Sequence, residues 1–158
     1  MPRFFRPALR ICDTLGLAAL AAIPAAAAPE AAGAPGAARV WFLWPSNSNV
    51  GYDTGAAPMI FANGVPVGAI RGGTDFYRDL APGTYSFTVE PYGLPTGQAA
   101  TLTLAPGTQT YLQVLWGPTW ERGYVGGRGQ MADSFFISPM SRRLAEAYLP
   151  TLAYIGPR

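Results

Sequence analysis

Alternation of apolar and polar residues is the clearest pattern in this chain. Tyr85, Phe87 and Val89 are separated by single polar or charged residues, and residues 101–104 alternate threonine with leucine. A period of two is typical of a β-strand that buries one of its faces. The apolar run RVWFLW, which begins at Arg39, has the length of another strand. The pattern therefore predicts a chain built mainly from strands.

The stretch IFANGVPVGAI contains the strongest turn signal. Asn63-Gly64 stands between two apolar runs and supplies the positive φ angles that a type I′ turn requires. We predict a hairpin with strands at about residues 58–62 and 66–70. Pro66 has no N–H, which places it on an edge strand or at the first residue of a strand. The run DFYRDL, a little further on, predicts a short strand.

The five letters LAPGT occur twice, at residues 80–84 and 104–108. Proline presets φ at one central turn position and glycine accepts a positive φ at the next, which is the chemistry of a type II turn. Each copy leads into a run rich in aromatic and β-branched residues. We interpret both copies as turns of a β-meander, with no function of their own.

Residues 117–133, GPTWERGYVGGRGQMAD, break this rhythm with five glycines and one proline. A loop of such length is uncommon in a compact domain and is often functional or disordered. The run SFFISPM, at residues 134–140, predicts a last strand after the loop.

The C-terminal part favours a short helix. Ser138 is a candidate N-cap, Pro139 fits the first helical position, and Pro150 ends the helix. The apolar residues at helical spacing, expected to face the sheet, are Met140, Leu144, Ala147 and Tyr148.

Together these elements predict an all-β fold. We expect an antiparallel β-sandwich of Ig-like or prealbumin-like type, with about seven or eight strands and the short C-terminal helix. Residues 39–158 form a single domain in this interpretation. Residues 29–38 are a flexible leader of alanine, proline and glycine, and residues 1–28 are a signal peptide.

The signal peptide is predicted from three consecutive features. Arg3, Arg6 and Arg10 precede an apolar stretch, and an alanine-rich tail follows with a cleavage site near Ala28. A membrane anchor is the alternative, but the apolar stretch is shorter than the roughly 20 residues that a spanning helix needs. Cys12 precedes the apolar stretch, which argues against lipid attachment. We therefore expect export to the periplasm or the medium, with no membrane anchor after cleavage.

Charge changes the expected partners. Residues 1–28 hold three arginines and one acidic residue, which leaves eight residues of each sign in the remaining chain. The net charge of +2 thus belongs to the signal peptide, and no nucleic-acid partner is expected.

Few catalytic groups are present. The chain has no histidine, and its one cysteine lies in the predicted signal peptide. Thiol or histidine catalysis and Cys/His metal sites are therefore excluded, and no cofactor or metal is expected. The carboxylate pairs Asp75 with Asp79 and Glu121 with Asp133 leave a hydrolase open as the weakest hypothesis. We expect that the protein is not an enzyme.

Aromatic residues give the better candidate site. Trp116, Trp120 and Tyr124 lie at or inside the glycine-rich segment, with Arg122 and Arg128 beside them. Flat aromatic side chains on a loop stack on sugars or anchor a protein partner. The alternative is that Trp116 ends a core strand and Trp120 folds back as a plug.

Residues 40–116 resemble a type of bacterial envelope domain. The motifs are NGVPVGAI, DFYRDL, LAPGTYSFTV and LTLAPGTQTYLQV. They are similar to PEGA-like and carboxypeptidase-regulatory-like β-sandwich domains, and to uncharacterised secreted or lipoprotein families of similar build. The resemblance implies a fold and carries no catalytic residues.

The sequence thus favours a non-enzymatic exported envelope or periplasmic module that mediates protein interaction or assembly. The alternative is a glycan-binding module that uses the aromatic residues of the 116–129 loop.

Overall fold

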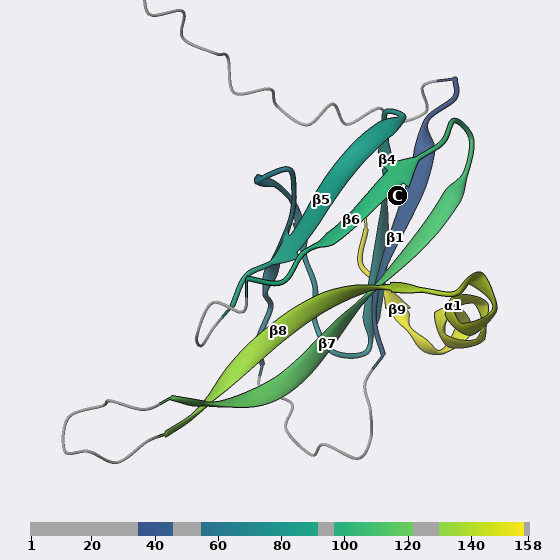
Figure 1. The fold of residues 1–158 in the computed structure, drawn as a ribbon. Helices are drawn as coiled ribbons and strands as arrows, with labels where there is room; N and C mark the ends of the chain where they lie inside the picture. Colours follow the sequence, from purple (N-terminus) through teal and green to yellow (C-terminus); the bar gives the residue numbers. More distant parts are fainter. Residues whose placement is uncertain (1–34, 46–54, 92–96, 122–129, 157–158) are drawn as a thin grey trace, which may run out of the picture.

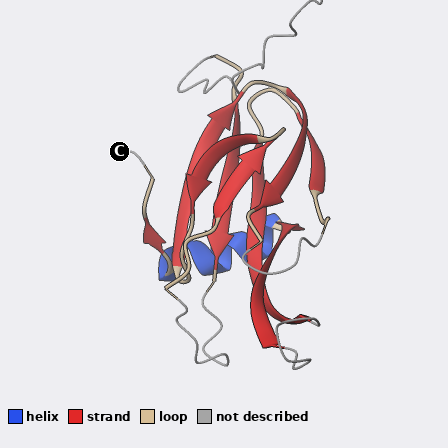
Figure 2. Ribbon diagram, turned by 90° about the vertical axis from the view of Figure 1, so that its left-hand side faces the viewer, coloured by secondary structure: helices blue, strands red, loops and turns tan. Residues whose placement is uncertain are grey.

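A computed structural model describes residues 35–45, 55–91, 97–121 and 130–156 (Figure 1). The side chains of residues 118–121 and 130–133 are not described. The predicted signal peptide and most of the leader lie outside the described residues. Strands dominate the molecule and form two sheets, with one short helix near the C-terminus (Figure 2).

The first sheet has five strands in the order β8-β7-β1-β4-β9. Their bounds are β1 Ala38–Trp44, β4 Thr74–Leu80, β7 Gln109–Glu121, β8 Gln130–Met140 and β9 Ala153–Tyr154. The pairs β1–β7 and β4–β9 are parallel, and the others are antiparallel.

The second sheet has four strands in the order β3-β2-β5-β6, and all its pairs are antiparallel. Their bounds are β2 Met59–Ala62, β3 Val65–Ala69, β5 Gly83–Val89 and β6 Ala100–Leu104.

The core lies between the two sheets. Phe42 and Phe76 from the first sheet stack with ring centroids 5.0 Å apart, and Phe87 from the second sheet meets Phe42 edge-on. These side chains are buried because alternate residues of each strand point inward. The predicted all-β sandwich is confirmed. The described residues contain nine strands, one more than the upper number expected, because β9 is a two-residue strand after the helix.

The predicted Asn-Gly hairpin is confirmed. Asn63 and Gly64 have φ angles of 50° and 80° between β2 and β3. Both values are positive, as a type I′ turn requires. Pro66 lies on β3, an edge strand of the second sheet, where its missing N–H costs no pairing partner.

Both LAPGT copies carry the chain from one sheet to the other. The first copy joins β4 to β5, and the second joins β6 to β7. The predicted meander holds only for β5 and β6, which pair with each other. Turn chemistry predicts a change of direction but not the sheet that the next strand joins, because partner choice depends on distant residues.

The two copies also differ in their bonding. In the second copy the Thr108 amide donates to the Ala105 carbonyl at 3.3 Å, and Gly107 has a φ of 68°, as predicted for a type II turn. In the first copy Gly83 already belongs to β5. The Tyr85 hydroxyl instead donates to the Ala81 carbonyl at 3.0 Å, the bond of a tyrosine corner.

The expected long loop at residues 117–133 is wrong in extent. β7 continues to Glu121 and β8 begins at Gln130, and these two residues pair across a long hairpin. Gly117 fits because a Cβ there would lie 3.3 Å from the Phe136 ring. Cross-strand pairing therefore extends both strands into the expected loop, and residues 122–129, which hold the other four glycines of the segment, lie outside the described part.

The helix α1 spans Arg142–Tyr148 and begins later than expected. Its N-cap is Ser141, whose side chain accepts from the Leu144 amide, because Ser138 and Pro139 still pair with β7 as part of β8. The face of the helix that packs on the sheet also differs from the one expected, because Leu144 is 45% exposed and Ala145 is buried.

The helix packs on the outer face of the five-stranded sheet through a small second cluster (Figure 2). Ala145 is fully buried there, with the partly buried Tyr148 and Leu149 beside it. The sheet contributes Leu43 and Tyr111 to this contact. The helix thus covers one end of the sheet face and leaves another part of that face for polar and aromatic side chains.

Candidate binding surface

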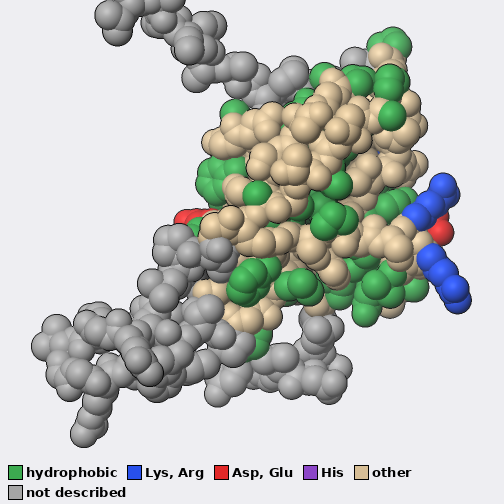
Figure 3. All heavy atoms as spheres, in the orientation of Figure 1, with side chains coloured by type: hydrophobic (Ala, Val, Ile, Leu, Met, Phe, Trp, Pro, Cys, Tyr) green, Lys and Arg blue, Asp and Glu red, His purple; other side chains and the backbone are tan. Residues whose placement is uncertain are grey.

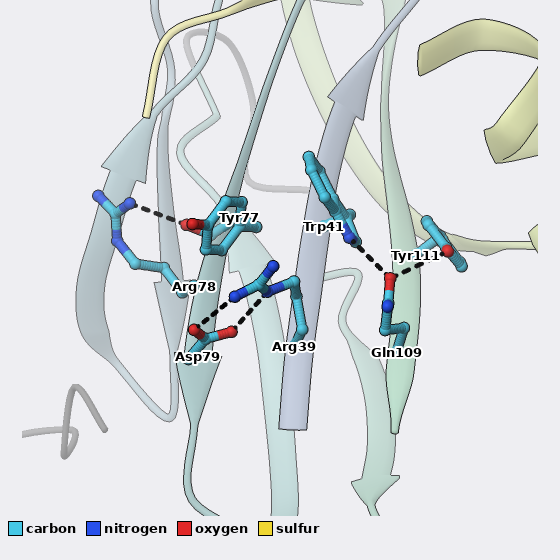
Figure 4. A network of polar contacts seen from close by, with 7 residues as sticks. All are labelled: Arg39, Trp41, Tyr77, Arg78, Asp79, Gln109 and Tyr111. Carbon is cyan, nitrogen blue, oxygen red and sulfur yellow. Dashed lines mark hydrogen bonds and ion pairs between the residues drawn. The ribbon is translucent and has the colours of Figure 1, made fainter. Parts of the chain in front are cut away.

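The outer face of the five-stranded sheet gathers aromatic and polar side chains from its central strands (Figure 4). Val40 and Phe42 of β1 point into the core, so Arg39 and Trp41 point outward. By the same alternation, Tyr77 and Asp79 point outward from β4. Gln109 and Tyr111 of the neighbouring β7 lie beside them, and Figure 4 draws these six residues together with Arg78 of β4.

Three rings form what we call the aromatic patch: Trp41, Tyr77 and Tyr154. The ring centroids of Trp41 and Tyr77 are 5.0 Å apart, and those of Tyr77 and Tyr154 are 5.7 Å apart in a stacked arrangement. Tyr154 is 37% exposed, and the other two are half-buried. Burial and a hydrogen bond with Tyr77 raise the pKa of Tyr154 above its ordinary value.

An ion pair flanks the aromatic patch. Arg39 Nε and Nη2 donate to the two carboxylate oxygens of Asp79 at 2.7 and 2.8 Å, and the guanidinium carbon lies 3.8 Å from the Tyr77 ring centroid. The hydrogen bond from Arg39 lowers the pKa of Asp79, and the same bond raises the pKa of Arg39. The guanidinium is therefore held in a fixed plane by a bidentate bond and by the ring.

Gln109 fixes the orientation of Trp41. Its side-chain oxygen accepts from Trp41 Nε1 at 3.2 Å and from the Tyr111 hydroxyl at 3.3 Å. The indole therefore has its hydrogen bond within the sheet and presents mainly apolar surface to a ligand.

Asp75 lies on the same outer face, next to Leu43 in the strand pairing and beside the C-terminal strand β9. It is 3% exposed, and burial raises its pKa. Asp79 is engaged by Arg39, so Asp75 and Asp79 differ in environment and do not share one site. The other candidate pair, Glu121 and Asp133, lies on β7 and β8, with side chains outside the description.

The residues proposed from the glycine-rich segment are placed only in part. Trp116 lies on β7 opposite Phe135, is half-buried and packs against the main core. The backbone of Trp120 belongs to β7, but its side chain is not described, and Arg122, Tyr124 and Arg128 lie outside the described residues. Trp116 packs on the core as the alternative expected, but it does not end the strand, because β7 continues to Glu121 and includes the backbone of Trp120.

Sequence reasoning missed the aromatic patch. The signal was present in part, because Trp41 in RVWFLW and Tyr77 in DFYRDL occupy the outward positions of an alternating strand. Tyr154 could not be added from the pattern, since only the parallel pairing of β9 with β4 brings it to this face.

No family model matches the chain, and neither a curated protein nor a solved structure matches it. The described residues contain no group of three acidic, histidine or cysteine side chains placed to hold a metal ion. No helix in that part of the chain has the length and apolar character to cross a membrane.

Proposed function

We propose that this chain is an exported, non-enzymatic module of the cell envelope that binds a protein partner. Its leader-like N-terminus supports export, and the lack of histidine and of a cysteine outside that region supports a role without catalysis. The resemblance of residues 40–116 to envelope domains agrees with both points.

The observation that carries the proposal is the aromatic patch with Arg39 beside it. Trp, Tyr and Arg are the residue types that contribute most to protein interfaces. Here each is already held by neighbours, through Gln109, Asp79 and the stacked rings. A partner that binds to such a surface immobilises few additional rotamers, which lowers the entropic cost of association.

A protein partner suits this patch better than a sugar. Sugar rings stack on open aromatic faces, but the Tyr77 ring already contacts Tyr154 and the Arg39 guanidinium. The half-exposed edges and the ion pair offer contacts to protein side chains instead. A glycan site at residues 116–129 stays a prediction, because most of those residues lie outside the described part.

The test is in-cell crosslinking followed by affinity purification from the envelope fraction. Wild-type protein is compared with Tyr154→Ala and Arg39→Ala, which truncate the patch, and with Thr88→Ala on the outer face of the other sheet as a matched control. We expect one stoichiometric protein that is lost with both patch variants and retained with the control. That protein is then titrated with the purified chain.

A partner that is equally retained by all four proteins would place the binding surface elsewhere. Absence of any protein partner from the wild-type sample would overturn the proposal and direct the search to glycan arrays, with Trp120→Ala as the variant.

A further inference from the structure

The four-stranded sheet differs from the rest of the molecule in its lack of charge. None of its strands, MIFA, VPVGA, GTYSFTV and ATLTL, contains a charged residue. Figure 3 views the molecule from the side of β5 and β6, and the described charged side chains that it shows lie at the rim. Thr101 and Thr103 of β6 are exposed on this side.

The hydrogen bonds of β5 show which way the backbone of β6 points. The Ser86 carbonyl accepts from the Asn63 amide at 2.9 Å, and the Glu90 amide donates to the Met59 carbonyl at 2.8 Å. Even-numbered residues of β5 therefore direct their backbone groups toward β2, and odd-numbered residues direct them toward β6. Since Tyr85 lies opposite Leu102, Leu102 bonds to β5. Thr101 and Thr103 consequently direct N–H and C=O to the open side of β6.

The other sheet edges carry features that hinder pairing with another strand. Pro66 removes a donor from β3. The Gln98 side chain accepts from the Ile137 amide at 2.9 Å and donates to the Ile137 carbonyl, so it occupies the edge of β8. At the remaining edge, β9 pairs with only two residues of β4. Past the end of β9, the Arg78 guanidinium donates to the Tyr77 carbonyl of β4 at 3.0 Å.

β6 has no such feature among the described residues. It contains neither proline nor charge, and it is the outermost strand of its sheet. An uncharged edge of this kind is a template for pairing with another strand.

We propose that β6 pairs with β6 of a second copy of this chain, antiparallel about a twofold axis at Leu102. Thr101 then lies opposite Thr103 of the partner subunit, and Thr103 lies opposite Thr101 of the partner subunit. Because these residues direct their backbone groups outward, each pair exchanges two hydrogen bonds. The two four-stranded sheets become one continuous sheet in a closed dimer.

A second copy fits this edge for two reasons. The edge is complementary to itself, since threonine meets threonine, and the sheet already contains such a pair in Thr84 and Thr103, whose hydroxyls are 3.0 Å apart. The four strands also contain no charged residue that would be brought against its own copy. The dimer leaves the aromatic patch on the other sheet free, so this proposal and the protein-partner proposal can fail independently.

Disulfide trapping tests the register directly. In a Cys12→Ser background the introduced thiol is the only one, so Thr101→Cys and Thr103→Cys are prepared as single variants. Opposed residues in a bonded antiparallel pair have Cα atoms about 5.5 Å apart, within disulfide reach. We expect a disulfide-linked dimer when the two variants are mixed under oxidation, and little in either variant alone. Equal linking of a single variant with itself, or none in the mixture, overturns the register.

Sedimentation equilibrium of the uncrosslinked chain tests the association itself. We expect a monomer–dimer equilibrium that Thr103→Lys weakens at least about tenfold, since lysine blocks an edge strand. Thr88→Lys, on the same face but inside the sheet, should leave it unchanged. A wild-type monomer at all concentrations overturns the proposal, and so does dissociation by Thr88→Lys alone, which would indicate face-to-face packing. If circular dichroism shows that Thr103→Lys does not fold, the disulfide trapping of Thr101→Cys with Thr103→Cys tests the proposal in its place.

Discussion

Asp75 and Asp79 lie on the same face of one strand, and their surroundings shift their pKa values in opposite directions. Hydrogen bonding from Arg39 lowers the pKa of Asp79, whereas burial raises that of Asp75. Asp79 therefore contributes stability above its unfolded pKa, and this contribution is lost as pH falls through the folded pKa. The contribution of Asp75 to stability has the opposite pH dependence. It is present below the unfolded pKa of Asp75 and is lost as pH rises through the folded pKa.

We expect Asp79→Asn to lower the free energy of unfolding near neutral pH by about 0.5–1 kcal/mol, since the ion pair is partly exposed. The difference from wild type should shrink in acid, where wild-type Asp79 is also protonated. Urea unfolding at a neutral and an acidic pH measures it. Asp75→Asn is the matched control and should not destabilise the protein near neutral pH. A loss that stays constant with pH would contradict the assigned role of the charge.

At the scale of elements, the two copies of the LAPGT sequence form different connections in different surroundings. The first LAPGT ends in a tyrosine corner between β4 and β5, and the second forms a hydrogen-bonded turn between β6 and β7. Each is followed by a tyrosine that is almost fully buried, Tyr85 or Tyr111. The Tyr85 hydroxyl bonds back to the connection that precedes its strand, whereas the Tyr111 hydroxyl bonds to Gln109 of its own strand.

We predict that Tyr85→Phe lowers the free energy of unfolding by about 1 kcal/mol, because it leaves the Ala81 carbonyl without its donor. Tyr111→Phe, after the second copy, removes a longer bond to Gln109 and should cost less. Chemical denaturation of the two variants beside wild type gives the comparison. Equal decreases in the free energy of unfolding would mean that the hydrogen bond from Tyr85 to Ala81 stabilises the fold no more than the bond from Tyr111 to Gln109.

At the scale of the whole molecule, the hydrophobic core stabilises the fold without a disulfide, because no cysteine follows the predicted signal peptide. Apolar residues of both sheets form one main cluster, and a smaller cluster attaches the helix to the outer face. The two clusters lie on opposite faces of β1, so that strand is buried on both sides over part of its length.

We expect the thermal unfolding midpoint to change little between about pH 6 and pH 8, because no histidine is present to titrate there. Differential scanning calorimetry across that range measures it. A steep decline with rising pH would indicate that burial places the pKa of Asp75 inside the window, and Asp75→Asn should then flatten the curve.

Local patterns determined much of this protein from the sequence by itself. The alternation of residues 85–89, the Asn63-Gly64 turn and the all-β class follow from side-chain periodicity and backbone preferences, which act over a few residues. The candidate site was predicted less well: Trp116 is packed on the core, and the patch around Tyr77 was not anticipated.

Tertiary structure alone decided what depends on distant partners. β1 lies between β4 and β7, which come much later in the chain, and this pairing brings Arg39 to Asp79 and Trp41 to Gln109. Pairing between the consecutive strands β7 and β8 extended both into the segment expected to be a loop and delayed the start of the helix to Arg142. A single sequence carries the preferences of each segment, but which segments meet is settled by the packing of the whole core, and the outer surface follows from that choice.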